Sequence, residues 1–155
     1  MEAAPTLKRP LGRTEHIYWL LDQLYCLNFV AFAEVEGPLD EAAMQSALAI
    51  VQQENPVLRA RIVIDRNNRP CFTPVTIKER PLVLEICSLR NWRRQIDSQL
   101  MKAFDPETEP LARFVWYRGK GSKSVVAMVF HHAIADGKSG ACVLLEVLRR
   151  ACGDA

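Results

Sequence analysis

In the stretch Ser124-Val-Val-Ala-Met-Val-Phe-His-His-Ala-Ile-Ala-Asp-Gly137, an apolar strand leads directly into two histidines. Residues 125–130 are apolar at both alternating sets of positions, so this strand belongs in the middle of a sheet with both faces covered. The chain then turns at Asp136-Gly137 and enters a helix. Two imidazoles and a carboxylate therefore follow a buried strand, where groups can be dry on one side and reachable on the other.

Four helices are expected from apolar residues that recur every three to four positions. Thr14 and Asp40 are the expected N-cap residues of the first two helices. Asn55-Pro56 ends the second, because the residue before a proline avoids the helical region. The apolar positions that identify the helices are Ile17, Leu20, Leu21 and Leu24; Met44, Ala47, Leu48 and Val51; Trp92, Ile96, Leu100 and Phe104; and Ala141, Leu144, Leu145 and Leu148.

Strands are expected between these helices, and polar turns join several of them into hairpins. Irregular alternation of helix and strand predicts an α+β fold, a two-layer arrangement in which helices cover a mixed, largely antiparallel sheet. Residues 1–12 are expected to form an N-terminal arm, and residues 13–155 one domain long enough to bury a single core. The expected strands are 26–35, 58–64, 70–75, 82–87, 111–117 and 124–130, and the last two helices are 91–103 and 139–152.

Composition excludes several classes of protein. The chain of 155 residues has 20 basic and 18 acidic residues, and this balance argues against a dedicated nucleic-acid binder. No apolar run approaches the roughly 18 residues of a membrane span, and the first ten residues lack the apolar middle of a signal peptide. A cytoplasmic protein is expected. Its five widely spaced cysteines are interpreted as free thiols.

The adjacent histidines allow three interpretations. A single histidine at a strand end is more often structural, but two of them, with Asp136 and Gly137 at fixed offsets, favour a chemical role. A metal site is not expected, because His131 and His132 alternate between faces and only His16 remains as a further imidazole. The third interpretation is acyl transfer, in which an imidazole takes a proton from the acceptor and returns one to a leaving thiol.

His131 to Gly137 resembles the HHxxxDG signature of the chloramphenicol-acetyltransferase-like superfamily. This superfamily includes nonribosomal peptide condensation domains, alcohol acyltransferases and polyketide-associated acyltransferases. Further segments resemble its members in the right order along nearly the whole chain. They are the opening segment at 11–19, the entry to the second helix at 37–44, an arginine-bearing segment at 55–59, and residues 104–105 with 110–113 before the motif strand.

The resemblance implies a role for each residue of the motif. His132 would be the general base, and His131 its structural neighbour. Asp136 would be structural and would pair with Arg59, with Arg61 on the same face of an extended strand as the alternative partner. Gly137 would keep the acceptor channel open.

The resemblance also implies an activity. The chain would be the amino-terminal lobe of a two-lobed acyltransferase of natural-product biosynthesis, with the active site in the cleft between the lobes. The acyl group would move from a thioester of CoA or of a carrier-protein phosphopantetheine to a hydroxyl or an amine, and no cofactor or metal would be held permanently.

No second-lobe motif is present in the sequence. The chain is therefore expected to fold but to catalyse poorly, and to bind the missing lobe or self-associate through an uncovered apolar surface. The alternative function is a non-catalytic lobe that binds a carrier protein or another chain and retains the motif as a relic.

Overall fold

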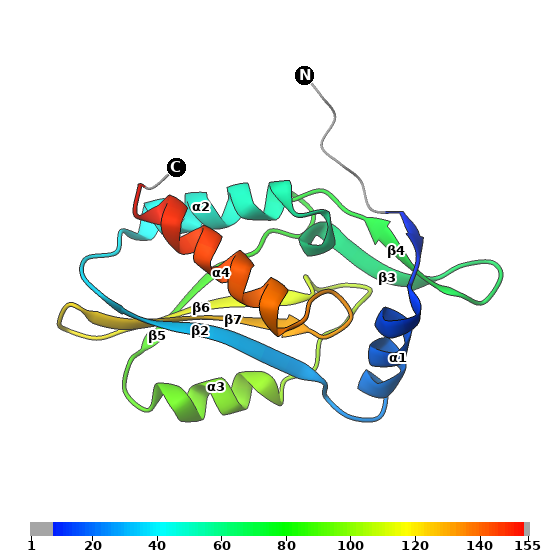
Figure 1. Ribbon diagram of the computed structural model, residues 1–155, viewed down its shortest axis with the longest axis horizontal. Coiled ribbons are helices and arrows are strands. Elements are labelled where there is room, and N and C mark those ends of the chain that lie inside the picture. Colours follow the sequence, from blue (N-terminus) through cyan, green and yellow to red (C-terminus); the bar gives the residue numbers. More distant parts are fainter. Residues whose placement is uncertain (1–7, 154–155) are drawn as a thin grey trace, which may run out of the picture.

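Two sheets form the framework of the computed structural model, which describes residues 8–153 (Figure 1). The larger sheet has the order β2-β7-β6-β5, and all its pairs are antiparallel except β5–β6, which is parallel. Its strands are β2 (Asn28–Glu36), β5 (Leu84–Ser88), β6 (Ala112–Arg118) and β7 (Lys123–His131). The smaller antiparallel sheet has the order β1-β4-β3, with β1 (Arg9–Pro10), β3 (Ala60–Ile64) and β4 (Pro70–Pro74).

Helices cover both faces of the larger sheet. Helices α2 (Glu41–Glu54) and α4 (Gly137–Ala151) pack together on one face, and α3 (Trp92–Leu100) lies on the other (Figure 1). Helix α1 (Arg13–Asp22) lies beside the end of β7. The predicted α+β fold, a mixed and largely antiparallel sheet covered by helices, is confirmed, and α3 adds a layer on the second face. Among the helices within residues 8–153, none has the length and apolar character that crossing a membrane requires.

Strand β7 lies between β2 and β6, and all of its residues except Lys123 are buried. The prediction of a central strand is therefore confirmed, because a chain with apolar side chains on both faces is stable only where both faces are covered. Strand β7 continues one residue beyond the predicted end, since His131 pairs with Asn28 of β2. Two adjacent histidines thus occupy the strand's last residue and the first residue of the following turn.

One of the two predicted N-cap residues is confirmed by the structure and the other is not. Asp40 caps α2 as predicted, since its carboxylate accepts the N–H of Ala43 at 2.8 Å. The prediction for Thr14 is wrong, because α1 begins at Arg13 with Gly12 as the N-cap residue. The Glu15 carboxylate accepts the Gly12 N–H and forms an ion pair with Arg9. By bonding back to Gly12, this side chain caps the helix at its first turn.

Two further boundaries differ from the predictions for local reasons. Residues 56–59 form a short 3₁₀ helix rather than the start of a strand, because Pro56 begins a turn at its first position. The third helix ends at Leu100, so Phe104 lies outside it. Beyond that end, the Arg113 guanidinium donates to the carbonyls of Lys102 and Ala103 at 2.9 and 2.7 Å. Of the predicted N-terminal arm, residues 1–7 lie outside the described residues.

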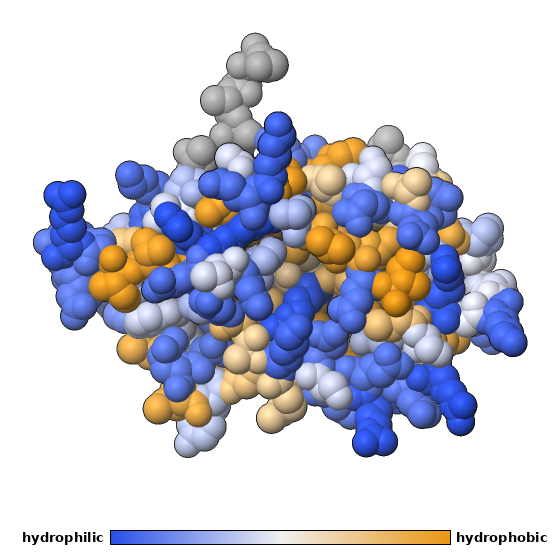
Figure 2. All heavy atoms as spheres, turned by 180° about the vertical axis from the view of Figure 1, so that it is seen from behind, coloured by the Kyte–Doolittle hydropathy of each residue, from blue (hydrophilic) through white to orange (hydrophobic). Residues whose placement is uncertain are grey.

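The apolar residues that identified two of the helices are not all buried. Ile17 and Leu20 of α1 are 55% and 49% exposed, Leu24, just after the end of the helix, is 72% exposed, and α1 has no fully buried residue. Figure 2, with α1 at the lower left, shows apolar side chains reaching the surface there. In α4 the buried residues are Gly140, Leu144 and Val147, whereas Leu145 is exposed. Helical spacing predicted both helices correctly but did not identify which side the sheet covers.

Gly140 allows α4 to approach the sheet closely. A Cβ atom at this position would lie 2.7 Å from the ring of Phe29 and 3.0 Å from that of Phe130, and these two rings are stacked on each other. A Cβ atom at Gly137, one turn earlier, would meet nothing within 4 Å. The packing of this chain therefore requires a glycine at position 140 but not at position 137.

This contrast predicts opposite effects of two alanine substitutions in one helix. Gly140→Ala is expected to lower the free energy of unfolding by about 1–3 kcal/mol, because the aromatic rings must move. Gly137→Ala is expected to leave it unchanged or to raise it by up to about 1 kcal/mol, because alanine favours the helix. Urea unfolding of both variants measures the difference. Equal stabilities would show that the close approach of α4 is not required.

Candidate active site

His131 is completely buried at the end of β7, and both of its ring nitrogens face polar groups. Nδ1 accepts the N–H of Ala133 at 3.0 Å. Nε2 lies 3.2 Å from Oδ2 of Asp22, although the N–H does not point straight at the oxygen. Because Nδ1 is an acceptor, the ring proton of neutral His131 is on Nε2, toward the carboxylate.

Burial lowers the pKa of His131 below its ordinary value. The charge of Asp22 acts in the opposite direction, and the neighbouring His132 adds to the lowering. The net direction is downward, so His131 is neutral at pH 7. The structural role of His131 stays a prediction, and its ring lies between these two groups.

Asp22 is a residue of the site that the sequence analysis did not identify. Its side chain is only 7% exposed, and its Oδ1 accepts the N–H of Leu27 at 2.9 Å. One local signal was available, because a carboxylate at the C-terminal end of a helix is unfavourable next to the helix dipole and needs a partner elsewhere. That signal gives no indication that the partner is His131, which is far away in the sequence.

His132 lies in the turn after β7, where its ring packs against aromatic side chains. It stacks on Tyr18 of α1, with ring centroids 4.3 Å apart and planes 14° apart. Phe29 of β2 lies at 4.8 Å in a tilted arrangement. The Nδ1 atom is buried and has no hydrogen-bond partner among residues 8–153, so Nε2 is the nitrogen that can meet a substrate.

A cavity of about 190 Å³ opens beside His132. Its walls come from α1, from the turn after β7 and from the start of α4. His132 is one of the lining residues, so a proton donor that entered the cavity would lie near its ring. The residues that line it are Thr14, Glu15, Tyr18, His132, Ala133, Ile134, Ala135, Asp136 and Ser139.

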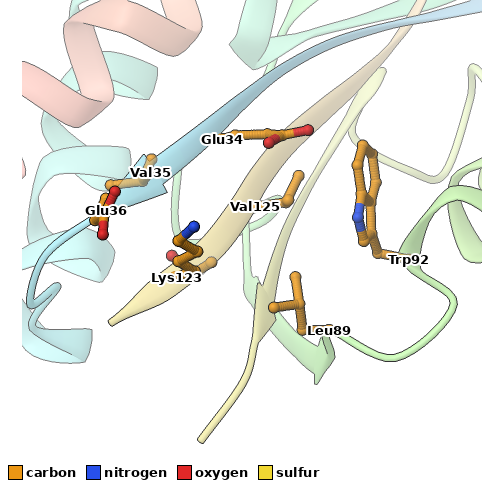
Figure 3. Close-up of a pocket in the computed structure, with 8 residues that line it drawn as sticks. Glu34, Val35, Glu36, Leu89, Trp92, Lys123 and Val125 are labelled. Carbon is orange, nitrogen blue, oxygen red and sulfur yellow. The ribbon is translucent and has the colours of Figure 1, made fainter. Parts of the chain in front are cut away.

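A second hollow, of about 250 Å³, lies at the opposite end of β7 (Figure 3). Trp92 and Leu89 form one side of it, and Glu34, Glu36 and Lys123 supply its charged groups. The hollow contains no imidazole, and it is separated from His132 by the length of a nine-residue strand, roughly 30 Å. The cavity at His132 is therefore the better candidate for an active site, although it is smaller.

Asp136 has a partner close to it in the sequence. Its carboxylate is exposed and caps α4, since Oδ1 accepts the N–H of Ser139 at 2.8 Å. The hydrogen bonds from Ser139 lower the pKa of the Asp136 carboxyl. The ion pairs within residues 8–153 do not join Asp136 to Arg59 or to Arg61, so the structure does not confirm that pairing. A local cap satisfies this carboxylate, and Arg59 is buried at the end of the 3₁₀ helix.

The remaining predicted residue, Gly137, is exposed at the first position of α4. It lies next to the cavity lined by Asp136 and Ser139. Within residues 8–153, no cluster of three or more His, Cys, Asp or Glu side chains is arranged to hold a metal ion. The structure thus brings His131, His132 and the start of α4 together.

Residues 19–153 match the family of condensation domains. The chain belongs to this family. Chondramide synthase cmdD of Chondromyces crocatus is 29% identical over 147 residues, which cover 84% of this chain and 4% of that protein. The resemblance predicted from the HHxxxDG motif is thereby confirmed at the level of the family.

Solved condensation domains share the fold. The first condensation domain of the calcium-dependent antibiotic synthetase, in complex with a substrate analogue, matches with a TM-score of 0.82 and 21% identity. The match covers 92% of this chain and 36% of that chain. The starter condensation domain of rhizomide synthetase RzmA matches with a TM-score of 0.78 and 16% identity, over 92% of this chain and 36% of that chain. This chain therefore corresponds to little more than a third of a solved condensation-domain chain.

The capping role of Asp136 in this condensation-domain chain predicts a pH-dependent loss of stability. Asp136→Ala should lower the urea midpoint at pH 7, whereas Asp136→Ser should retain most of it, because serine also caps helices. The folded-state pKa of Asp136 is lowered, so its contribution is complete above the unfolded-state pKa, about 3.9. The contribution is lost as the pH falls through the folded-state pKa, and Asp136→Ala should then converge with the parent, whereas the serine cap does not depend on pH. A difference between the parent and Asp136→Ala that persists at pH 2 would contradict this explanation.

Proposed function

We propose that this chain supplies the base-bearing lobe of a condensation domain that transfers an acyl or peptidyl group from a thioester to an amine or a hydroxyl. One observation carries the proposal: the ring of His132 is fixed by Tyr18 and Phe29 with Nε2 as its available nitrogen, beside an open cavity. A general base must be held in place and must reach its substrate. The match of residues 19–153 to condensation domains supports this assignment.

In the proposed reaction, Nε2 of His132 takes a proton from the acceptor while the acceptor atom attacks the thioester carbonyl. The new bond to carbon forms an oxyanion, and its collapse breaks the carbon–sulfur bond. The imidazolium then returns a proton to the leaving thiolate, so the base is regenerated. The neutral state of His131 supports this role, because a charged neighbour would oppose the positive charge that forms on His132.

The thioester donor is proposed to be CoA or a carrier-protein phosphopantetheine. A variant of the RzmA starter condensation domain was solved in complex with C8-CoA, with a TM-score of 0.79 to this chain. The similarity to chondramide synthase cmdD supports a role for this chemistry in natural-product biosynthesis. The acceptor would enter past Gly137, where the open space around the residue supports its proposed role in keeping a channel clear.

The exposed apolar residues of α1 support a further part of the proposal. Ile17 and Leu20 lie on the helix that also carries Tyr18, close to the cavity, and Leu24 lies just after its end. Large exposed apolar surfaces tend to be covered by partners. We therefore propose that this face is covered by the remainder of a two-lobed condensation domain, and that the isolated chain self-associates through it.

The assignment of His132 predicts a large and specific loss of transfer. In a protein containing the complete domain, His132→Ala should reduce thioester transfer by roughly 10²- to 10⁴-fold, the range typical of a general base. His16→Ala is the matched control, because His16 lies on the same helix as Tyr18 but does not line the cavity. Intact-mass measurement of acyl transfer gives the rate.

The same assay tests the alternative function. A non-catalytic lobe would bind an acyl carrier protein or another chain equally well with His132 or alanine at this position, and no transfer above background would be found in the parent. Near-normal transfer by His132→Ala would instead show that another group is the base.

The proposed channel predicts a separate effect at Gly137. Gly137→Val adds a branched side chain beside the cavity, where this chain offers no steric hindrance. The KM for the acceptor should rise severalfold, while the urea midpoint changes little. Gly137→Ala should show a smaller change in the same direction. An unchanged KM for both variants would exclude the channel at this position.

A further inference from the structure

Tyr18 and Asp22 lie one turn apart on the same face of α1. Each contacts one of the two adjacent histidines: Tyr18 stacks on His132, and Asp22 faces His131 at 3.2 Å. The opposite face of α1 is exposed. The inward face of this helix therefore contacts both histidines of the pair, each through a different residue.

We propose that α1 is a clamp for the histidine pair, in which Asp22 sets the tautomer of His131 and Tyr18 sets the ring orientation of His132. Both are positioning residues, because each acts on the reaction through a histidine. The consequence for catalysis rests on the proposed function, whereas the tautomer and the stacking can be measured without it.

The first step of the argument concerns the proton of His131. A carboxylate oxygen 3.2 Å from Nε2 favours the tautomer with its proton there, because a lone pair on Nε2 would be repelled. Nδ1 is then free to accept the N–H of Ala133 at 3.0 Å. With the proton on Nδ1 instead, two N–H groups would face each other and the turn would lose this bond.

The second step concerns the backbone on the other side of His132. Oδ1 of Asp22 accepts the Leu27 N–H at 2.9 Å, and the Leu27 carbonyl accepts the His132 N–H at 3.3 Å. The backbone N–H of His132 is held by Leu27, and that of Ala133 is held by the His131 ring. Both Leu27 and His131 contact Asp22. One buried carboxylate therefore fixes the peptide units on both sides of the proposed base.

The third step concerns the ring of His132. A hydrogen bond to the second nitrogen commonly orients a functional imidazole, but Nδ1 of His132 has no such partner among residues 8–153. Its orientation depends instead on the stack with Tyr18 and on the tilted contact with Phe29. A ring of a different kind at position 18 should preserve the stack, and an aliphatic side chain should release it.

The experiment uses the fact that the chain contains three histidines. With ¹⁵N-labelled histidine, long-range ¹H–¹⁵N correlation spectra report the tautomer of each ring, and single substitutions of His16, His131 and His132 assign the signals. The parent chain should show His131 with its proton on Nε2. A proton on Nδ1 would overturn the proposal without any variant.

Asp22→Asn tests the clamp further. Asparagine has one acceptor oxygen, so it can satisfy Leu27 only by turning its NH₂ group toward His131. The tautomer of His131 should then reverse or become mixed. Asp97→Asn, the same change at an exposed position of α3, is the matched control and should leave the spectrum of His131 unchanged. An unaltered tautomer in Asp22→Asn would overturn the role of Asp22.

Tyr18 provides an independent pair of variants if Asp22→Asn does not fold. Tyr18→Phe keeps an aromatic ring and should leave the ring-proton shifts of His132 near their parent values. Tyr18→Leu removes the ring current and should move these protons downfield, with increased ring mobility. Equal spectra for the two variants would overturn the stacking role.

The catalytic consequence is measured in the complete domain. Asp22→Asn and Tyr18→Leu should each lower kcat by about 10²-fold, the size associated with displacing a catalytic group by roughly 1 Å, with little change in KM. Tyr18→Phe should restore kcat. A reversed tautomer with unchanged kcat would overturn the positioning role, whereas full activity of His132→Ala would overturn only the proposed base and would leave the measured clamp intact.

Discussion

The burial of β7 on both faces is the constraint on which the site depends. Successive residues of a strand point to opposite faces, so a strand covered on both sides must place a histidine at its end in the interior. His131 is that residue, and its burial removes water from both ring nitrogens. A buried imidazole requires partners, and the structure supplies them from Ala133 and from Asp22. The geometry around His132 follows from how this first histidine is satisfied.

Much of the framework could be predicted because its signals are local. The apolar residues of β7, the capping carboxylate of Asp40 and the proline that follows Asn55 each act within a few residues of themselves. Their effect does not depend on what the rest of the chain does. The histidine pair belongs to this class too, because its position at the end of a strand can be read from the residues that precede it.

The features that could not be predicted depend on contacts between distant segments. Asp22 is an ordinary acidic residue until α1 places it beside His131, and nothing near it in the sequence specifies that contact. The covered face of α4 is decided by the close approach at Gly140, which the positions of Phe29 and Phe130 explain. Asp136 shows the converse, because the contact that its carboxylate makes at the start of α4 is a local cap, three residues along the chain.

Two glycines of α4 differ in what requires them: one is needed for the packing of this chain, and the other would be needed for a substrate. Gly140 is required by the aromatic rings beneath it, whereas Gly137 has open space around it and no packing reason to be glycine. Under the proposed function, the requirement at Gly137 comes from a molecule outside this chain. The exposed apolar face of α1 lies beside the same cavity. Under the same proposal, this chain orients the base but forms only part of the enclosure around it. Alignment of donor and acceptor, which supplies much of the rate in bimolecular transfer, would then come from the surface that covers that face.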